Sequence, residues 1–325
     1  MKKWILPDNK YHRKFNMWFA SFVKKNEEFL KPATSLEAFY GVLHQTIFAG
    51  GRHTNNENLE LAEIEKVLSH FVSCGVDYYL VFTQPLIKEE MLNDYWGNIQ
   101  LQYAEKYKLK VLVANNTLEK YIREKYSTIN LISSTTKMNK LEKSINEIEK
   151  YYQVVISTQE NNNLDKIPPE ARNKIEILVN DCCPPDCIKR KYCYVTTAKH
   201  NFGIINKAEP TCFNRLKQDY LNTCNWQEKK EFLKHLFIND VDAAEKKGFQ
   251  YFKLTGREAT FSLHVSEIMY YMIEEEYKMP FIFNALMDLD LLHEKNNREF
   301  YMLFNATTEI PSIGDFPFFN KIEHS

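Results

Sequence analysis

The chain has 325 residues, of which 44% are hydrophobic and 26% are charged, and its formal net charge is −1. This composition is ordinary for a globular protein with a sizeable core, and near-neutrality removes the main electrostatic argument for a general nucleic-acid binder. The apolar run before Pro7 is too short for a secretory signal, and no later run approaches the length of a membrane span. We therefore expect a cytoplasmic protein without a membrane segment, whose seven cysteines are reduced thiols or metal ligands.

The first part of the chain reads as a helical extension. Within residues 11–30, Trp18, Phe19 and Phe22 fall on one side of a helix, and Pro32 ends the pattern. From residue 35 onward, short apolar segments alternate with amphipathic helical segments. The expected strands span residues 37–43, 76–82, 110–114, 129–133, 152–157, 174–179 and 249–254. The expected helices span residues 58–73, 98–107, 118–126, 140–150, 227–236, 241–247 and 261–277.

This alternation predicts parallel strands joined by right-handed crossovers. Seven or eight such units favour a closed (β/α) TIM-like barrel over an open doubly wound sheet, and residues 281–286 are the candidate for an eighth strand. No GxGxxG or P-loop motif follows any expected strand, which weakens a nucleotide-binding alternative. The predicted organisation is an N-terminal helical extension (1–34), a barrel (35–290) with a cysteine-bearing insertion after the sixth strand (181–224), and a C-terminal tail packed on the barrel (291–325).

Chemistry in such a barrel lies at the C-terminal ends of the strands. The amides, hydroxyls and cations found there suit a polar or anionic ligand better than hydrolysis by paired carboxylates. Arg52 and Arg257 each adjoin a glycine and can clamp a carboxylate or phosphate, although pairing with acids on neighbouring loops explains them equally well. The candidate catalytic residues are Asn180, Lys253 and Arg257. The candidate substrate-binding residues are His44, Arg52, Asn115 and Gln159.

Residues 174–193, KIEILVNDCCPPDCIKRKYC, combine an apolar strand with clustered thiols. A strand followed by a turn and several cysteines is a way to place soft metal ligands at the rim of a sheet. The spacing is neither the CxxC…CxxC of a zinc ribbon nor the CxxxCxxC of enzymes that cleave S-adenosylmethionine. The residues alone therefore indicate a metal site and leave iron–sulfur, zinc and unligated thiols open.

Two segments resemble the collagenase-like U-thirty-two peptidases. The run ILVNDCCPPDC, followed by Arg190, is similar to that family's LVNE-x-C-x-x-x-C-P-x-R segment, with Ile188 where the family has a proline after the second cysteine. The run INDVDAAEKKGFQYFKLTGRE is similar to the family's IRPEDL…GID-x-FKI-x-GR segment. The resemblance spans residues 35–277 and is strongest in these two segments. The residues in matching places in the second are Phe252, Lys253, Gly256 and Arg257.

The resemblance implies a modified TIM barrel and, as in several members of the wider group, a 4Fe–4S cluster on four cysteines. Those members include oxygen-independent ubiquinone hydroxylation proteins and RNA-hydroxylation enzymes that use prephenate. The ligands implied are Cys183, Cys187 and Cys212, with Cys193 as the fourth and Cys182 and Cys224 as alternatives to it. Proteolysis is not supported, because the sequence offers no nucleophile–base pair and no HExxH.

Three functions follow from these observations. The first is an iron–sulfur barrel enzyme that modifies a small or RNA-borne substrate, with oxygen-independent hydroxylation as the reaction that the resemblance implies and zinc as the alternative metal. The second is a non-catalytic partner subunit whose metal site is structural. The third is a metal-independent barrel enzyme in which the loop at Arg52 binds an anionic substrate. The sequence leaves monomer, homodimer and heterodimer open.

Overall fold

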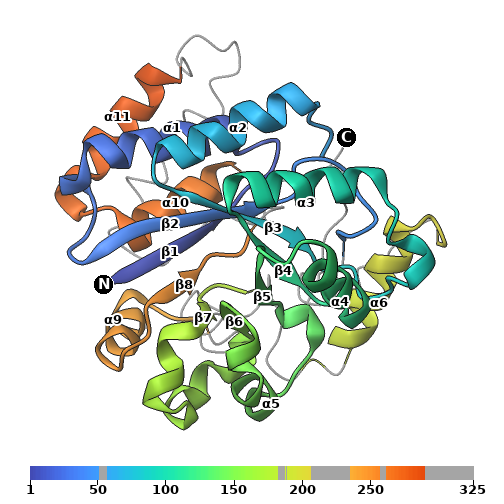
Figure 1. The fold of residues 1–325 in the computed structure, drawn as a ribbon. Coiled ribbons are helices and arrows are strands. Elements are labelled where there is room, and N and C mark those ends of the chain that lie inside the picture. The colour runs from blue at the N-terminus through green and yellow to red at the C-terminus, as the bar shows by residue number, and fades with distance from the viewer. Residues whose placement is uncertain (51–56, 182–186, 188, 206–234, 257–260, 290–325) are drawn as a thin grey trace.

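The expected barrel is present in the computed structural model, which describes residues 1–50, 57–181, 187, 189–205, 235–256 and 261–289. Each strand pairs in parallel with the next, and the last pairs with the first, so the sheet closes into an eight-stranded barrel (Figure 1). The strands are β1 (Lys2–Pro7), β2 (Thr34–Gly41), β3 (Asp77–Phe82), β4 (Lys110–Val113), β5 (Asn130–Ser133), β6 (Gln153–Ile156), β7 (Ile175–Leu178) and β8 (Tyr251–Lys253).

Helices surround the ring of strands (Figure 1). Among the described residues, β6 and β7 are joined by two 3₁₀ segments, Thr158–Lys166 and Pro169–Lys174, rather than by an α-helix. None of the described helices is long and apolar enough to cross a membrane. The α-helices are α1 (Arg13–Lys25), α2 (Leu61–Ser73), α3 (Tyr95–Tyr107), α4 (Asn116–Lys125), α5 (Leu141–Asn146), α6 (Arg190–Asn201), α9 (Ile238–Lys246), α10 (Phe261–Met272) and α11 (Lys278–Asp288).

The prediction that residues 1–34 form only a helical extension is wrong, because they supply the strand that closes the barrel. In β1, Trp4, Ile5 and Leu6 are fully buried, and the Trp4 ring lies 5.0 Å from that of Tyr271. A barrel strand is covered on both faces, so its apolar residues form a continuous run without the alternation that marks a half-exposed strand. The cysteine-bearing insertion consequently follows the seventh strand of the barrel and not the sixth.

The segment 281–286, expected as a candidate eighth strand, instead lies within α11. Phe281, Ile282, Ala285 and Leu286 are buried, whereas Phe283 between them is 57% exposed. Buried positions that recur after three and four residues mark one face of a helix, and a strand would have alternated. An apolar run of this length fits either element when its neighbours in space are unknown.

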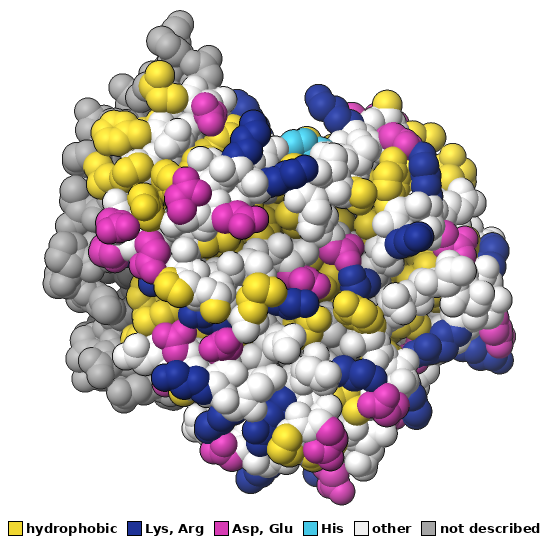
Figure 2. Space-filling model, turned by 60° about the vertical axis from the view of Figure 1, so that its left-hand side comes forward, with side chains coloured by type: hydrophobic (Ala, Val, Ile, Leu, Met, Phe, Trp, Pro, Cys, Tyr) yellow, Lys and Arg dark blue, Asp and Glu magenta, His cyan; other side chains and the backbone are white. Residues whose placement is uncertain are grey.

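Apolar side chains fill two layers, one between strands and helices and one inside the barrel. The interior layer contains Ile5, Tyr40, Tyr79, Ile132 and Leu178, among other residues from every strand. The outer surface carries positive and negative side chains interspersed, as the face drawn in Figure 2 shows. This mixture agrees with the net charge of −1 and places no large single-sign field on that face.

Candidate functional site

The C-terminal ends of β7 and β8 are joined by a polar network around Asn180. Its Oδ1 accepts a hydrogen bond from the Thr255 backbone N at 2.7 Å, and its backbone O accepts one from Thr255 Oγ1 at 3.1 Å. The Asn180 amide also donates to the carboxylate of Glu267 on α10. Asn180 therefore lies at the mouth, as predicted, but the structure uses its amide to hold two strand ends and a helix together.

A second network fixes the start of α6 against the mouth. The guanidinium of Arg190, which is 2% exposed, donates to Asp181 Oδ2 at 3.2 Å, to Ser157 Oγ after β6, and to Tyr194 Oη at 2.7 Å. His235 Nε2 lies 2.9 Å from the Asp181 backbone O. Because Arg190 and Asp181 are both buried, this ion pair anchors the part of the cysteine-bearing insertion around the start of α6.

Two of the predicted metal ligands, Cys187 and Cys193, lie in this anchored segment. Both are half-buried, and the Cys187 carbonyl accepts a hydrogen bond from the Arg190 backbone N at 3.2 Å. Within the described ranges, no group of three His, Cys, Asp or Glu side chains comes together as a metal site. The other predicted ligands, Cys183 and Cys212, and the alternatives Cys182 and Cys224 lie outside the described residues.

Lys253 is inside the barrel, where its role differs from the one expected. Its Nζ is 2.6 Å from Glu176 Oε1 and 4.0 Å from the centre of the Tyr40 ring, and both members of the ion pair are buried. Burial raises the pKa of Glu176, and the charge of Lys253 opposes that rise. Lys253 was expected at the mouth because it ends a strand, but its side chain follows the inward face of β8 to Glu176.

The predicted substrate-binding residues are dispersed around the mouth. His44 stacks on Trp96 with ring centres 3.5 Å apart, and its Nδ1 lies 2.8 Å from the Leu59 O. Asn115 begins α4 by accepting from the Leu118 N at 3.0 Å. Its Nδ2 donates to the carbonyls of Pro85 and Ile87 at 3.0 and 3.1 Å, so its side chain holds the loop after β3 against the start of α4. Gln159 is half-buried beside the Arg190 network, and Arg52 and Arg257 lie outside the described residues.

Sequence reasoning missed a buried ionic cluster at the end of β1. Asp8 Oδ2 accepts from Arg13 Nε and Nη2, both at 3.0 Å, and from Tyr78 Oη at 2.9 Å. Arg13 Nη1 donates to Glu57 Oε2 at 3.0 Å. Burial alone would lower the pKa of Arg13, but the carboxylates of Asp8 and Glu57 raise it above its ordinary value. Recognising β1 as a barrel strand would have revealed this cluster, because Asp8 directly follows β1 and an acid in that position lies at the mouth.

A histidine pair adjoins this cluster. His264 on α10 stacks on His12 with ring centres 4.4 Å apart and an interplanar angle of 3°. The Asn16 amide donates to Asp8 Oδ1 at 2.8 Å, so its oxygen faces His264 Nε2, 2.8 Å away, and Nε2 carries the proton. Complete burial, aided by the charge of His12, holds the pKa of His264 well below its usual value.

Acid is therefore expected to destabilise the protein through His264. An unfolded histidine takes up a proton near pH 6.5, whereas the folded His264 does not, so the unfolded state binds more protons below that pH. The free energy of unfolding should fall by up to about 1.4 kcal/mol per pH unit from this group as the pH drops below 6.5. Urea unfolding of wild type and His264→Gln between pH 7.5 and 5 measures it, and equal slopes for the two proteins would contradict the assignment.

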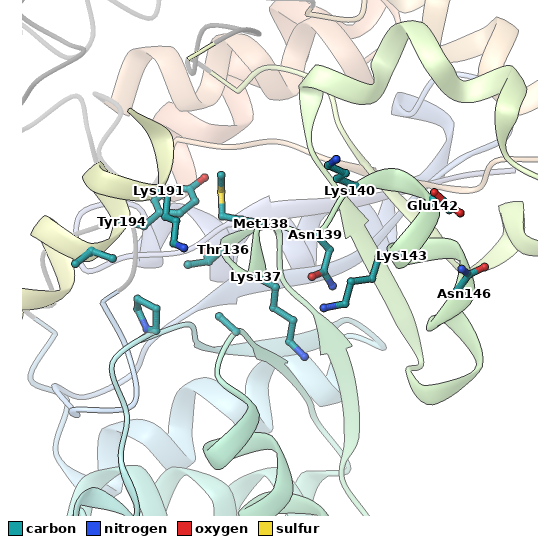
Figure 3. A pocket seen from close by; sticks show the side chains of 13 residues that line it. Thr136, Lys137, Met138, Asn139, Lys140, Glu142, Lys143, Asn146, Lys191 and Tyr194 are labelled. Carbon is teal, nitrogen blue, oxygen red and sulfur yellow. The ribbon is translucent and has the colours of Figure 1, made fainter. Parts of the chain in front are cut away.

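A cavity of about 730 Å³ opens on the same mouth, beyond β3, β4 and β5 (Figure 3). Its walls come from the segments that follow those strands, from α5 and from the first turns of α6. Met138, on the segment after β5, has φ of +57°, a left-handed conformation that is uncommon for a bulky side chain. The lining residues are Pro85, Ala114, Thr136, Lys137, Met138, Asn139, Lys140, Glu142, Lys143, Asn146, Lys191, Tyr194 and Val195.

Comparison with solved structures finds three matching chains, including the two that follow. The U32 peptidase Mk0906 is 13% identical with a TM-score of 0.48, over 78% of this chain and 92% of that one. The Bacillus cereus spore cortex-lytic enzyme SleL is 12% identical with a TM-score of 0.35, over 80% and 71%. The first belongs to the family whose segments the sequence resembles. No family model matches the chain, and no curated protein does.

Proposed function

We propose that the chain is a barrel enzyme with a cysteine-ligated metal centre at the mouth, beside the ends of β7 and β8. The observation that supports this most directly is the position of Cys187 and Cys193. Both half-buried thiols flank the buried Arg190, whose bonds to Asp181 and Ser157 hold their segment on the mouth. Cysteines that are only reduced core residues do not require an anchored polar segment of this kind.

The donor set fits a thiolate-bound centre in part. Cys187 and Cys193 provide two soft ligands of the kind that iron–sulfur clusters and zinc prefer, and Cys183 and Cys212 complete the set proposed. A bound 4Fe–4S cluster would supply electron-transfer chemistry, whereas zinc would supply a structural or Lewis-acid centre. The protein's own contribution is positional, since the Asn180 and Arg190 networks fix the strand ends and the start of α6.

The reaction proposed is the modification of a small or RNA-borne substrate, and oxygen-independent hydroxylation is the version that the family resemblance supports. The binding surface for that substrate is the remainder of the mouth, from His44 after β2 round to Gln159 after β6. Lys253 is not assigned a catalytic role, because Glu176 occupies its ammonium group.

Anaerobic preparation followed by metal and sulfide analysis tests the metal centre. We expect iron and inorganic sulfide, with a brown colour, in the wild-type protein, and loss of most of the bound metal in Cys187→Ser and Cys193→Ser. Cys74→Ser is the matched control, because Cys74 lies at the end of α2 beside His70 and away from the mouth. It should keep its metal.

The outcomes separate the functions that the sequence left open. If the wild-type protein contains zinc instead of iron, the proposed metal centre stands but its chemistry is not that of an iron–sulfur cluster. A metal-free wild-type protein, or full metal retention in both mouth variants, would sink the proposal. If Cys187→Ser loses metal and stability together with no separate loss of activity, the metal is a structural staple.

A further inference from the structure

The cavity beyond β3, β4 and β5, hereafter the lysine cavity, carries an excess of positive charge. Four lysines and one glutamate line it. Of the lysines, Lys137 is already engaged by Glu119 and by Tyr151. Lys140, Lys143 and Lys191 form no ion pair with any residue in the part of the chain that the structure describes. Figure 3 shows Lys143 and Lys191 entering the cavity from opposite sides, from α5 and α6.

The cations at the start of α6 occupy positions that helix stability disfavours. Lys189 directly precedes helix α6, which begins with Arg190 and Lys191 and has no acidic residue in its first turn. Cations at a helix N-terminus oppose the macrodipole, typically by 0.3–1 kcal/mol each, about the size of one hydrogen bond. Lys140, directly before α5, and Lys143, in its last turn, are three residues apart, a spacing at which like charges repel. Charges that oppose local stability in this way are expected where a ligand compensates for them.

Besides the lysines, the lining combines polar side chains with a group of apolar ones. Pro85, Ala114, Met138 and Val195 contribute alkyl groups, and the Tyr194 ring is held in place by its hydrogen bond from Arg190. The left-handed backbone at Met138 directs this segment between the strand end and α5. Apolar side chains beside ammonium groups suit a small molecule that has both a ring and an anionic group, and lysine is a common phosphate ligand.

We propose that the lysine cavity binds a small organic phosphate, with the phosphate between Lys143 and Lys191 and the ring on the Met138–Tyr194 side. This deepens the proposed function, because it names the class of substrate that the barrel mouth takes, and it rests on that function only for the ligand's role as substrate. Binding itself requires no metal. In this proposal Lys143 and Lys191 bind the anionic group, in place of Lys253 and Arg257, the candidates taken from the sequence.

Calorimetric titration with adenosine 5′-monophosphate, adenosine and inorganic phosphate at one ionic strength tests the proposal. We expect the monophosphate to bind, and adenosine and inorganic phosphate each to bind at least about tenfold more weakly. The double variant Lys143→Gln/Lys191→Gln should weaken monophosphate binding by about tenfold or more. The control Lys66→Gln removes an exposed lysine from α2 and should change nothing.

Three results would overturn the inference. The first is the absence of monophosphate binding, and the second is monophosphate binding that the double variant leaves unchanged. The third is a single-stranded RNA oligonucleotide that binds through these two lysines while the monophosphate does not, which would make the cavity part of a polymer site. Repeating the titration with Cys187→Ser separates the two proposals. Retained monophosphate binding in a metal-free protein would leave this inference standing even if the metal centre fails.

Discussion

Replacing Lys253 with methionine is expected to lower the free energy of unfolding by about 3–5 kcal/mol, because it leaves the Glu176 carboxylate buried without its partner. Nζ and Oε1 are 2.6 Å apart inside the barrel, and both residues are almost fully buried. Burial already raises the pKa of Glu176, and Lys253 opposes the rise. Without Lys253 the folded protein favours the protonated acid, so the loss of stability should grow as the pH rises above the pKa of an unfolded glutamate.

Urea unfolding of Lys253→Met at pH 5 and pH 8 measures both the loss and its pH dependence. The double variant Glu176→Leu/Lys253→Met removes both charges and should recover most of the stability. Lys246→Met, an exposed position on α9, is the matched control and should stay within about 0.5 kcal/mol of wild type. If Lys253→Met instead kept its stability and lost ligand binding, the catalytic role first predicted from the sequence would return.

The strands that the sequence predicted share a local signal, and the one it missed lacks it. Residues 76–82, 110–114 and 174–179 are apolar runs bounded by polar turns, so β3, β4 and β7 could be found without knowing their neighbours. β1 has only three apolar residues before Pro7, and its strand character comes from pairing with β2 and β8, far along the chain. The segment 281–286 shows the reverse case, in which an apolar run was assigned to a strand but follows a helical period.

Position at a strand end identifies the mouth but not the direction of a side chain. Asn180 follows β7 and Lys253 ends β8, yet the first bonds to Thr255 across the rim and the second bonds to Glu176 inside the barrel. Glu267 and Arg190 reach the mouth from helices, and no local pattern announces that. The lysine cavity joins segments from four parts of the chain, so its charge becomes visible only when the barrel brings α5 and α6 together.

Arg13→Met is expected to destabilise the protein by about 3–5 kcal/mol, comparable to the loss at Lys253. The change leaves two carboxylates unpaired beside each other, Asp8, whose side chain is fully buried, and Glu57, whose side chain is 9% exposed. Both Arg13 bonds to Asp8 are 3.0 Å long, and the bond to Glu57 has the same length. The cluster fastens α1 to the end of β1, so its loss should loosen the strand that closes the barrel.

Two further variants make this expectation specific. Arg13→Lys retains the charge but cannot reproduce the planar fork of three bonds, so its stability should fall between wild type and Arg13→Met. Arg123→Met removes a 43%-exposed arginine that pairs with Glu119 on α4 and should lose no more than about 1 kcal/mol. Urea unfolding at pH 7.5 compares the three. An Arg13→Met protein no less stable than Arg123→Met would mean that the carboxylates at the end of β1 are relieved by protonation or water, and that β1 is held by its apolar residues alone.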